Sequence, residues 1–296
     1  MQVPKAQQDT SDLEKHFHIF GNGIAFSISP TIHNAGFKHH DLPYTYDIRE
    51  SADIDGAAHL IEDDSFGGGS VTMPHKLQVH RYCQRQTETA KLIGAINTLI
   101  VSGQGQDRII TGDNTDWSGL YNIMAMHANR SGEPLESGLV IGAGGASRAA
   151  LYAMHRAGVQ RIFITNRTQA TATAIKKAFS QVFEITVLPT LKDLPQEVDV
   201  IIGTIPADVT SEADYEDIFG PRGLCIDMSY KPRQTPLLLA AKKHQGWDII
   251  TGIQVLLSQA FDQYKLWTGK DAPRTAILDA VTLHEAGEKI EIEGKL

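Results

Sequence analysis

The stretch G-L-V-I-G-A-G-G-A-S-R-A-A, residues 138–150, decides the fold of the second half of the chain. Its first four residues are typical of the end of a buried strand, and Gly142, Gly144 and Gly145 then break that strand in a tight turn. Small and helix-forming residues follow the turn. Strand, glycine turn and helix together point backbone N–H groups and a helix N-terminus at a phosphate, so the stretch favours dinucleotide binding. For these residues alone, a plain tight turn between strand and helix is the alternative.

Strands and helices alternate regularly from this stretch to residue 250. Such alternation predicts a parallel sheet that is covered by helices on both faces. The expected strands are residues 139–141, 161–165, 184–188, 198–204, 224–228 and 248–250, and the expected helices are residues 146–157, 169–179 and 237–244. Two longer helices are expected at residues 254–267 and 274–287.

The first half of the chain also mixes strands and helices, in a less regular order. Residues 1–15 are polar and are expected to form a flexible leader. Strands are expected at residues 18–23, 44–48, 67–73, 96–101 and 108–111, and helices at residues 31–40, 52–61, 75–82, 88–93 and 117–129. The last of these helices leads into the second half.

Length, charge and cysteine content narrow the class of protein. A chain of 296 residues fits two domains or one large α/β unit. The net charge of −8 argues against nonspecific nucleic-acid binding, and no apolar run reaches the roughly 18 to 20 residues that span a bilayer. Cys83 and Cys225 lie far apart and favour a reduced, cytoplasmic setting. The histidines show no metal-ligand spacing, so no metal is expected.

The strand after the glycine turn bears on the choice of cofactor. In a dinucleotide fold this strand ends near the ribose, and an acidic residue there indicates NAD. Here the strand leads into Asn166, Arg167 and Thr168, so no acid stands at its end. A guanidinium is a planar cation with several donors and suits a 2′-phosphate. These residues therefore favour NADP over NAD, with a solvated loop arginine as the alternative.

Polar side chains interrupt the first half at the ends of its apolar segments, where loops carry sites. Their hydroxyls, amides, ammonium and carboxylate suit a small polyhydroxylated substrate. In one pocket, Asp116 would hold the Lys76 ammonium, and Lys76 would pass a proton to or from an alcohol oxygen. Taken singly, each cluster also fits a helix start, a cap or a surface position. The clusters are S-I-S-P at 27–30, T-M-P-H-K at 72–76, N-T at 97–98 and N-T-D at 114–116.

Motifs along nearly the whole chain resemble those of the shikimate/quinate dehydrogenase family, in the order that the family has them. Several are most similar to fungal members, including the dehydrogenase portion of the fused aromatic-pathway enzyme. The motifs are G-N-G-I-A-F-S-I-S-P-T-I-H-N at 21–34, G-S-V-T-M-P-H-K at 69–76, I-G-A-I-N-T at 93–98, G-D-N-T-D at 112–116, G-A-G-G-A at 142–146, N-R-T at 166–168, D-M-S-Y-K-P-R-Q-T-P-L at 227–237 and T-G-I-Q-V-L-L-S-Q-A at 251–260.

The resemblance implies a role for each polar position of these motifs. On the substrate side it implies a catalytic pair, Lys76 and Asp116, carboxylate ligands Ser27 and Ser29, hydroxyl ligands Thr72, Asn97 and Gln259, and a pocket-closing Tyr230. On the cofactor side it implies pyrophosphate ligands Gly142, Ala143, Gly144, Gly145 and Ala146, 2′-phosphate ligands Asn166, Arg167 and Thr168, and further cofactor contacts at Thr204 and Gly252.

The resemblance also implies an α/β fold with two domains and the active site between them. Residues 1–118 and 256–296 would form the substrate-binding catalytic domain, with the C-terminal helices returning to it, and residues 119–255 the Rossmann-like NADP-binding domain. The implied reaction is the reversible NADPH-dependent reduction of 3-dehydroshikimate to shikimate. Thr171 stands where the family often has a second basic residue, which leaves NAD possible as cofactor.

Two alternatives to this function stay open at the level of sequence. One is an NAD-dependent quinate dehydrogenase, because one sequence does not rank shikimate against quinate. The other is a ligand-sensing domain of a quinate-pathway repressor, similar in fold but without turnover. Because Lys76 and Asp116 are both present, the sequence favours an active enzyme.

Overall fold

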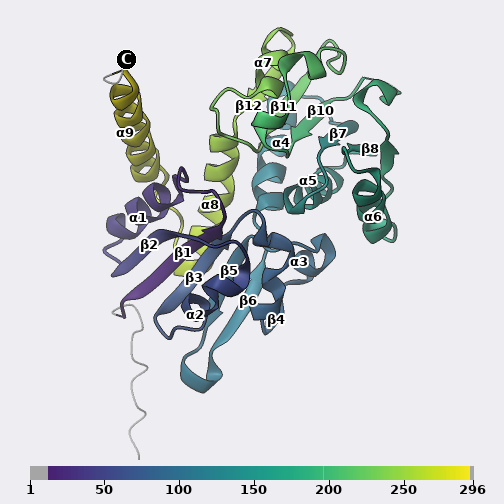
Figure 1. The fold of residues 1–296 in the computed structure, drawn as a ribbon. Helices are drawn as coiled ribbons and strands as arrows, with labels where there is room; N and C mark the ends of the chain where they lie inside the picture. The colour runs from purple at the N-terminus through teal and green to yellow at the C-terminus, as the bar shows by residue number, and fades with distance from the viewer. Residues whose placement is uncertain (1–12, 196, 294–296) are drawn as a thin grey trace, which may run out of the picture.

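The computed structural model describes residues 13–195 and 197–293, which form two α/β halves (Figure 1). Each half is built on a six-stranded sheet. Two long helices, α4 (Asp116–Ser131) and α8 (Gly252–Thr268), run between the halves and pack against each other. The chain therefore enters the second half through α4 and leaves it through α8.

The sheet of the second half is wholly parallel and has the strand order β12-β11-β10-β7-β8-β9. Counted from its first strand, this is the order of a Rossmann fold. The expected parallel sheet is thus confirmed. Its strands are β7 (Ser137–Ile141), β8 (Arg161–Thr165), β9 (Thr186–Leu188), β10 (Val200–Gly203), β11 (Gly223–Asp227) and β12 (Trp247–Ile250).

Both faces of this sheet are buried, which explains its continuous apolar strands. Val140 packs into one core with helices α5 (Gly145–Arg156) and α6 (Gln169–Phe179). Its neighbours Leu139 and Ile141 point the other way, into a core with helix α7 (Pro236–Lys242). Successive residues of one strand therefore serve opposite helix layers.

The sheet of the first half is mixed and has the order β2-β1-β3-β5-β6-β4. Strands β1, β2 and β3 are parallel, while β5 runs antiparallel to both β3 and β6. The strands expected at residues 96–101 and 108–111 form the antiparallel pair β5–β6, and the turn between them contains Gly103 with φ +73°. The strands are β1 (Lys15–Gly21), β2 (Tyr44–Glu50), β3 (Phe66–Val71), β4 (Arg85–Gln86), β5 (Thr98–Ser102) and β6 (Ile109–Asp113).

The C-terminal helices return to the first half. Apolar side chains of α1 (Ser29–His39), α8 and α9 (Arg274–Glu293) form one core cluster, and α9 lies beside α1 in Figure 1. The remaining helices are α2 (Ala58–Ile61) and α3 (Glu88–Ile93). No helix in the described part of the chain is both long and apolar enough to cross a membrane.

Three expectations for the first half were wrong in detail. Residues 75–82 form two 3₁₀ turns, η3 (His75–Leu77) and η4 (Val79–Tyr82), where a helix was expected. The Lys76 carbonyl accepts from Ile96 N at 2.9 Å, so it does not accept the hydrogen bond that would continue an α-helix. The helix expected at 52–61 is a 3₁₀ turn followed by α2. Lys15, placed in the leader, begins β1; residues 1–12 of that leader lie outside the described residues.

Candidate active site

Lys76 and Asp116, which lie 40 residues apart, meet in an ion pair with Nζ and Oδ2 separated by 2.5 Å. Lys76 lies in the turn η3 after strand β3, and Asp116 is the first residue of α4. Their side chains are 14% and 6% exposed, so little water screens the pair. A negative charge at a helix N-terminus is also favourable, which stabilises the Asp116 carboxylate where the pair needs it.

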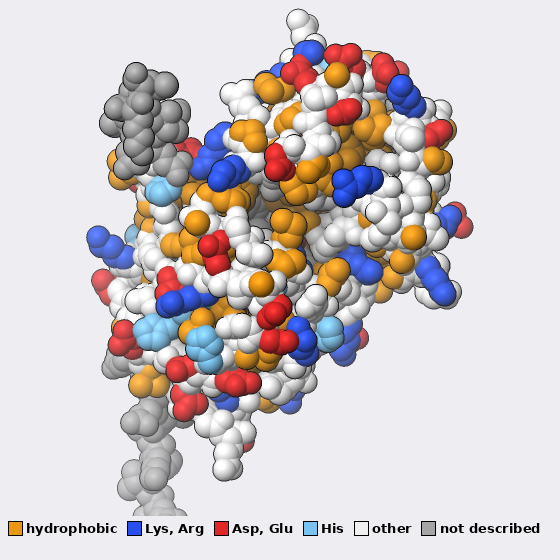
Figure 2. All heavy atoms as spheres, viewed as in Figure 1, with side chains coloured by type: hydrophobic (Ala, Val, Ile, Leu, Met, Phe, Trp, Pro, Cys, Tyr) orange, Lys and Arg blue, Asp and Glu red, His pale blue; other side chains and the backbone are white. Residues whose placement is uncertain are grey.

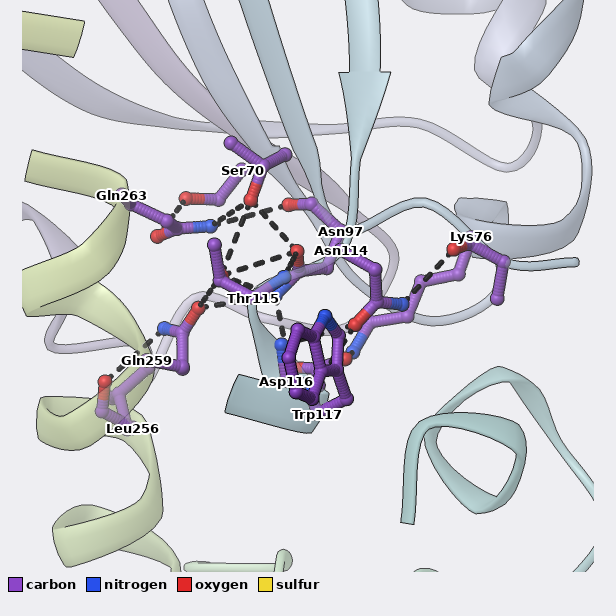
Figure 3. A network of polar contacts seen from close by, with 12 residues as sticks. Ser70, Lys76, Asn97, Asn114, Thr115, Asp116, Trp117, Leu256, Gln259 and Gln263 are labelled. Atoms are coloured by element: carbon purple, nitrogen blue, oxygen red, sulfur yellow. Dashed lines mark hydrogen bonds and ion pairs between the residues drawn. The ribbon is translucent and has the colours of Figure 1, made fainter. Parts of the chain in front are cut away.

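Asn97 joins this pair to the C-terminal helix α8. Its Nδ2 donates to Asp116 Oδ1 at 2.9 Å and to Gln259 Oε1 at 3.1 Å (Figure 3). The Thr115 hydroxyl also donates to Gln259 Oε1, at 2.9 Å. Asn97 and Gln259, both predicted as substrate ligands, therefore lie beside the ion pair and are buried with it.

A second layer of buried polar groups lies behind these residues and was missed by sequence reasoning. Gln263, one helical turn after Gln259, donates through Nε2 to Thr98 Oγ1 at 2.9 Å. Its Oε1 accepts from Ser70 Oγ at 3.0 Å, and Ser70 Oγ in turn accepts from the Tyr46 hydroxyl at 2.6 Å. The spacing of two glutamines by four residues on α8 was the only signal in the sequence.

The predicted carboxylate ligands Ser27 and Ser29 are both buried. Ser27 lies in the loop before α1, and Ser29 is the first residue of that helix. Ser27 Oγ donates to Ser29 Oγ at 3.1 Å. Ser29 is hydrogen-bonded to Tyr46, so the serine pair belongs to the same network as Asn97. Members of all four polar clusters of the first half thus meet in one region. The Thr72 hydroxyl forms no hydrogen bond with another described residue, but the N–H of its neighbour Val71 donates to Asn97 O at 2.7 Å.

Tyr230 reaches the serine pair from the second half of the chain, out of the loop after β11. It is hydrogen-bonded to Ser27, and burial raises the pKa of its hydroxyl. A protonated phenol can donate a hydrogen bond to a carboxylate. Ser27, Ser29 and Tyr230 therefore form a set of hydroxyl groups in which every member is neutral.

His33 lies one helical turn after Ser29 and is fully buried among aromatic rings. Its ring stacks on Tyr46 at 4.6 Å between centroids, and it lies 4.8 Å from the ring of Trp267. Burial lowers its pKa from 6.5 to about 3, so the ring is neutral at physiological pH. The stack holds Tyr46, and through Tyr46 the serine pair, in place.

Because the pKa of His33 is lowered in the fold, its contribution to stability is complete above pH 6.5 and is lost as the pH falls toward 3. At about pH 5 the loss amounts to about 2 kcal/mol. We expect the free energy of unfolding, measured with urea at about pH 7 and about pH 5, to fall less between these two pH values in His33→Leu than in wild type. The exposed His39, replaced by Leu, is the control. An equal decline in wild type and His33→Leu would contradict the assignment.

The glycine turn between β7 and α5 has the backbone that the sequence predicts. Gly142 has φ +117°, and a Cβ there would meet Thr204 Oγ1 at 2.4 Å, so only glycine fits. The Thr204 hydroxyl donates to Ile141 O at 2.8 Å and shares a 2.6 Å hydrogen bond with Ser147. Thr204 thus braces the turn from the end of β10. At Gly144 a Cβ would meet no atom within 4 Å, so the turn faces open space there.

Gly145 brings this turn against Lys76 of the ion pair. A Cβ at Gly145 would lie 3.0 Å from Lys76 Cβ and 3.5 Å from Ala95 Cβ. The N-terminus of α5, which the sequence assigns to a phosphate, therefore lies beside Lys76 of the first half. Figure 2 shows a hollow between the two halves on the face that it draws, with hydrophobic side chains around it.

The remaining predicted cofactor residues lie around the ends of the parallel strands. Arg167 and Thr168 are exposed after β8, and Asn166 Nδ2 donates to Thr168 O at 2.9 Å. Gly252 begins α8 so close to the loop after β11 that a Cβ would meet Ser229 O at 2.5 Å. A helix N-terminus and an open glycine turn at the carboxyl end of β7 fit the pyrophosphate of a dinucleotide.

Three stretches of the chain match known protein families. Residues 19–99 match the family described as shikimate dehydrogenase substrate binding domain. Residues 131–234 match shikimate / quinate 5-dehydrogenase, and residues 252–282 match shikimate 5'-dehydrogenase C-terminal domain.

Similar proteins include both a multifunctional polypeptide and single-function chains. The chain is 37% identical over 303 residues to the pentafunctional AROM polypeptide of Scheffersomyces stipitis, covering 95% of this chain and 19% of that one. It therefore spans about a fifth of the length of the pentafunctional relatives that it matches.

Two solved structures match over almost their whole length. Shikimate 5-dehydrogenase from Mycobacterium fortuitum is 30% identical, with a TM-score of 0.75, covering 90% of this chain and 97% of that chain. Shikimate 5-dehydrogenase from Thermus thermophilus, in complex with NADP(H) and shikimate, is 25% identical, with a TM-score of 0.73, covering 90% and 98%.

Proposed function

Because the chain belongs to the shikimate dehydrogenase family, we propose that it catalyses the reversible NADPH-dependent reduction of 3-dehydroshikimate to shikimate. The contact between Gly145 and Lys76 carries this proposal. A dinucleotide on the glycine turn and a substrate on Lys76 would share one space, as hydride transfer requires. The similar Thermus thermophilus enzyme is in complex with NADP(H) and shikimate, which supports both ligands.

The chain's own part in this reaction is to move a proton and hold the substrate. When bound, NADPH supplies a hydride to the carbonyl carbon. The Lys76 ammonium donates a proton to the carbonyl oxygen as that oxygen becomes an alcohol, and it takes the proton back in the reverse direction. Asp116 Oδ2, at 2.5 Å, keeps Lys76 Nζ in position and balances its charge.

The substrate would lie with its carboxylate on the serine pair and its ring on the catalytic pair. Ser27, Ser29 and Tyr230 offer hydroxyl donors at one end, and Asn97 and Gln259 offer amide groups at the other. The Thr72 hydroxyl forms no hydrogen bond with another described residue and is available to a ring hydroxyl. These groups fix the orientation of a small polyhydroxy carboxylate.

We propose NADP over NAD because Arg167 is exposed beyond the end of β8. Removing a charge-assisted contact with a 2′-phosphate costs about 1.5 to 3 kcal/mol, so we expect Arg167→Ala to raise KM for NADP about ten- to hundredfold. KM for NAD should change less than about twofold, because NAD has no 2′-phosphate. Steady-state kinetics with both cofactors checks this.

Arg161→Ala is the matched control for this variant. Arg161 is an exposed guanidinium at the opposite end of the same strand, where it pairs with Glu136 at 3.4 Å. An unchanged KM for NADP in Arg167→Ala, or an equal rise in Arg161→Ala, would remove Arg167 as the phosphate ligand.

One assay tests the proposed function as a whole. Nicotinamide absorbance is followed with shikimate or quinate against NADP or NAD, and we expect the highest kcat/KM for shikimate with NADP. A higher value for quinate with NAD would make the chain a quinate dehydrogenase. Binding of either acid by calorimetry without any change in absorbance would indicate a ligand-sensing domain.

The division into domains and the cellular setting are part of the same proposal. Residues 1–118 and 256–296 would form the substrate domain and residues 119–255 the cofactor domain, with boundaries inside α4 and α8. These two helices connect the halves, so a change in the angle between the halves would act at them. Cys83 and Cys225 are both free thiols, which supports a reducing, cytoplasmic compartment.

A further inference from the structure

The three residues that would hold the substrate carboxylate in the proposed site carry no charge of their own. Ser27, Ser29 and Tyr230 are hydroxyl residues, and the Lys76 ammonium is already paired with Asp116. The proposed substrate is an anion, and the chain as a whole has a net charge of −8. A cation near the serine pair would therefore be needed to draw the substrate in.

Lys231 is a cation that the fold brings to this end of the site. It directly follows Tyr230, and its Nζ lies 4.6 Å above the ring centroid of Phe26. Phe26 directly precedes Ser27, is 37% exposed and packs edge-on against Tyr230 at 5.5 Å. Phe26 belongs to the first half of the molecule and Lys231 to the second, so their contact bridges the halves beside the serine pair.

No carboxylate of the described residues pairs with the Lys231 ammonium, whereas the nearby Arg233 does have such a partner. Arg233, whose guanidinium lies 5.7 Å from the Tyr230 ring, pairs with Glu285 at 3.2 Å. Lys231 itself is exposed, and its Nζ lies over the face of the Phe26 ring. Figure 2 shows Lys and Arg side chains beside the hollow between the halves.

We propose that Lys231, resting on the Phe26 ring, is the residue that attracts the substrate carboxylate and guides it to Ser27 and Ser29. This inference rests on the proposed function, since it assumes an anionic substrate on the serine pair. A cation on an exposed ring face is held weakly, so the ammonium can turn from the ring to a carboxylate. Lys231 acts on substrate recognition and takes no part in proton transfer.

The test compares Lys231→Gln with wild type at about 20 mM and about 0.5 M NaCl, because salt screens an exposed charge. We expect Lys231→Gln to raise KM for shikimate about tenfold at low salt, with kcat changed less than about twofold, and the difference to shrink at high salt. Lys231→Arg should retain the wild-type KM. Lys177→Gln, which removes the same charge from the exposed face of α6, is the matched control.

A neutral substrate separates charge from packing. With the methyl ester of shikimate, Lys231→Gln and wild type should have the same KM. An equal rise in KM for acid and ester, or the same rise in Lys177→Gln, would overturn the proposal. If wild type does not oxidise shikimate at all, the proposed function fails. Calorimetric binding of shikimate to wild type and Lys231→Gln then decides on Lys231 by itself, and equal affinities would overturn its role.

Discussion

Lys76→Ala is expected to lower kcat for shikimate oxidation by at least about 10²-fold, the scale of a lost acid/base group. The Lys76 ammonium is the proton donor and acceptor of the proposed reaction, and alanine leaves nothing at its place. The substitution also leaves the Asp116 carboxylate, 6% exposed, without its counter-charge. Steady-state kinetics measures the loss, and circular dichroism with NADPH binding verifies that the fold and the cofactor site survive.

Lys91→Ala is the control for this substitution. Lys91 is 54% exposed on α3 and pairs with Glu88 on the same helix, so its loss removes a charge without touching the pair. We expect kcat of Lys91→Ala to match wild type. A kcat for Lys76→Ala within about threefold of wild type would show that another group moves the proton.

Asp116→Asn is the second substitution with a large expected effect, a loss of about 10²-fold in kcat. The amide has the shape of the carboxylate and still offers an oxygen to Asn97 Nδ2, which donates to Oδ1 at 2.9 Å. It carries no charge, however, and its NH₂ group would face the Lys76 ammonium with no lone pair to offer. Lys76 then loses the partner that positions it.

The double variant gives the sharper measurement. If Lys76 and Asp116 act as a unit, Lys76→Ala combined with Asp116→Asn should cost about as much as the larger single change, because the second change removes nothing further. If the two losses in kcat multiply instead, the residues have independent roles.

Asp262→Asn is the control for Asp116→Asn. The Asp262 carboxylate of α8 is hydrogen-bonded to Ser118 at 2.5 Å and lies outside the proposed chemistry.

The fold of the second half could be predicted closely from local patterns. Its strands are buried on both faces, so they are continuous apolar runs. The helices between them repeat their apolar residues every three to four positions. The first half was harder to predict at residues 75–82, where a helix was expected. There the Lys76 carbonyl bonds to Ile96 N, a residue 20 positions away, and no local pattern reports such a bond.

Part of the candidate site could likewise be predicted from local motifs, and part of it could not. Sequence motifs named Lys76, Asp116 and Asn97, since each belongs to a short polar cluster at the end of an apolar segment. They did not reveal Gln263 or Ser70, which lie 193 residues apart and meet in a hydrogen bond of 3.0 Å. Such a contact depends on how α8 returns to the first sheet, which is a property of the whole fold.

By itself the sequence determined the glycine turn at Gly142, because a backbone with positive φ and no room for a Cβ is a local requirement that only glycine meets. It also determined which residue types stand at the ends of the strands. Tertiary structure alone decided that Gly145 lies against Lys76 and that Phe26 lies under Lys231. These contacts join separate halves of the molecule, and their geometry is set by the packing of α4 and α8 between them.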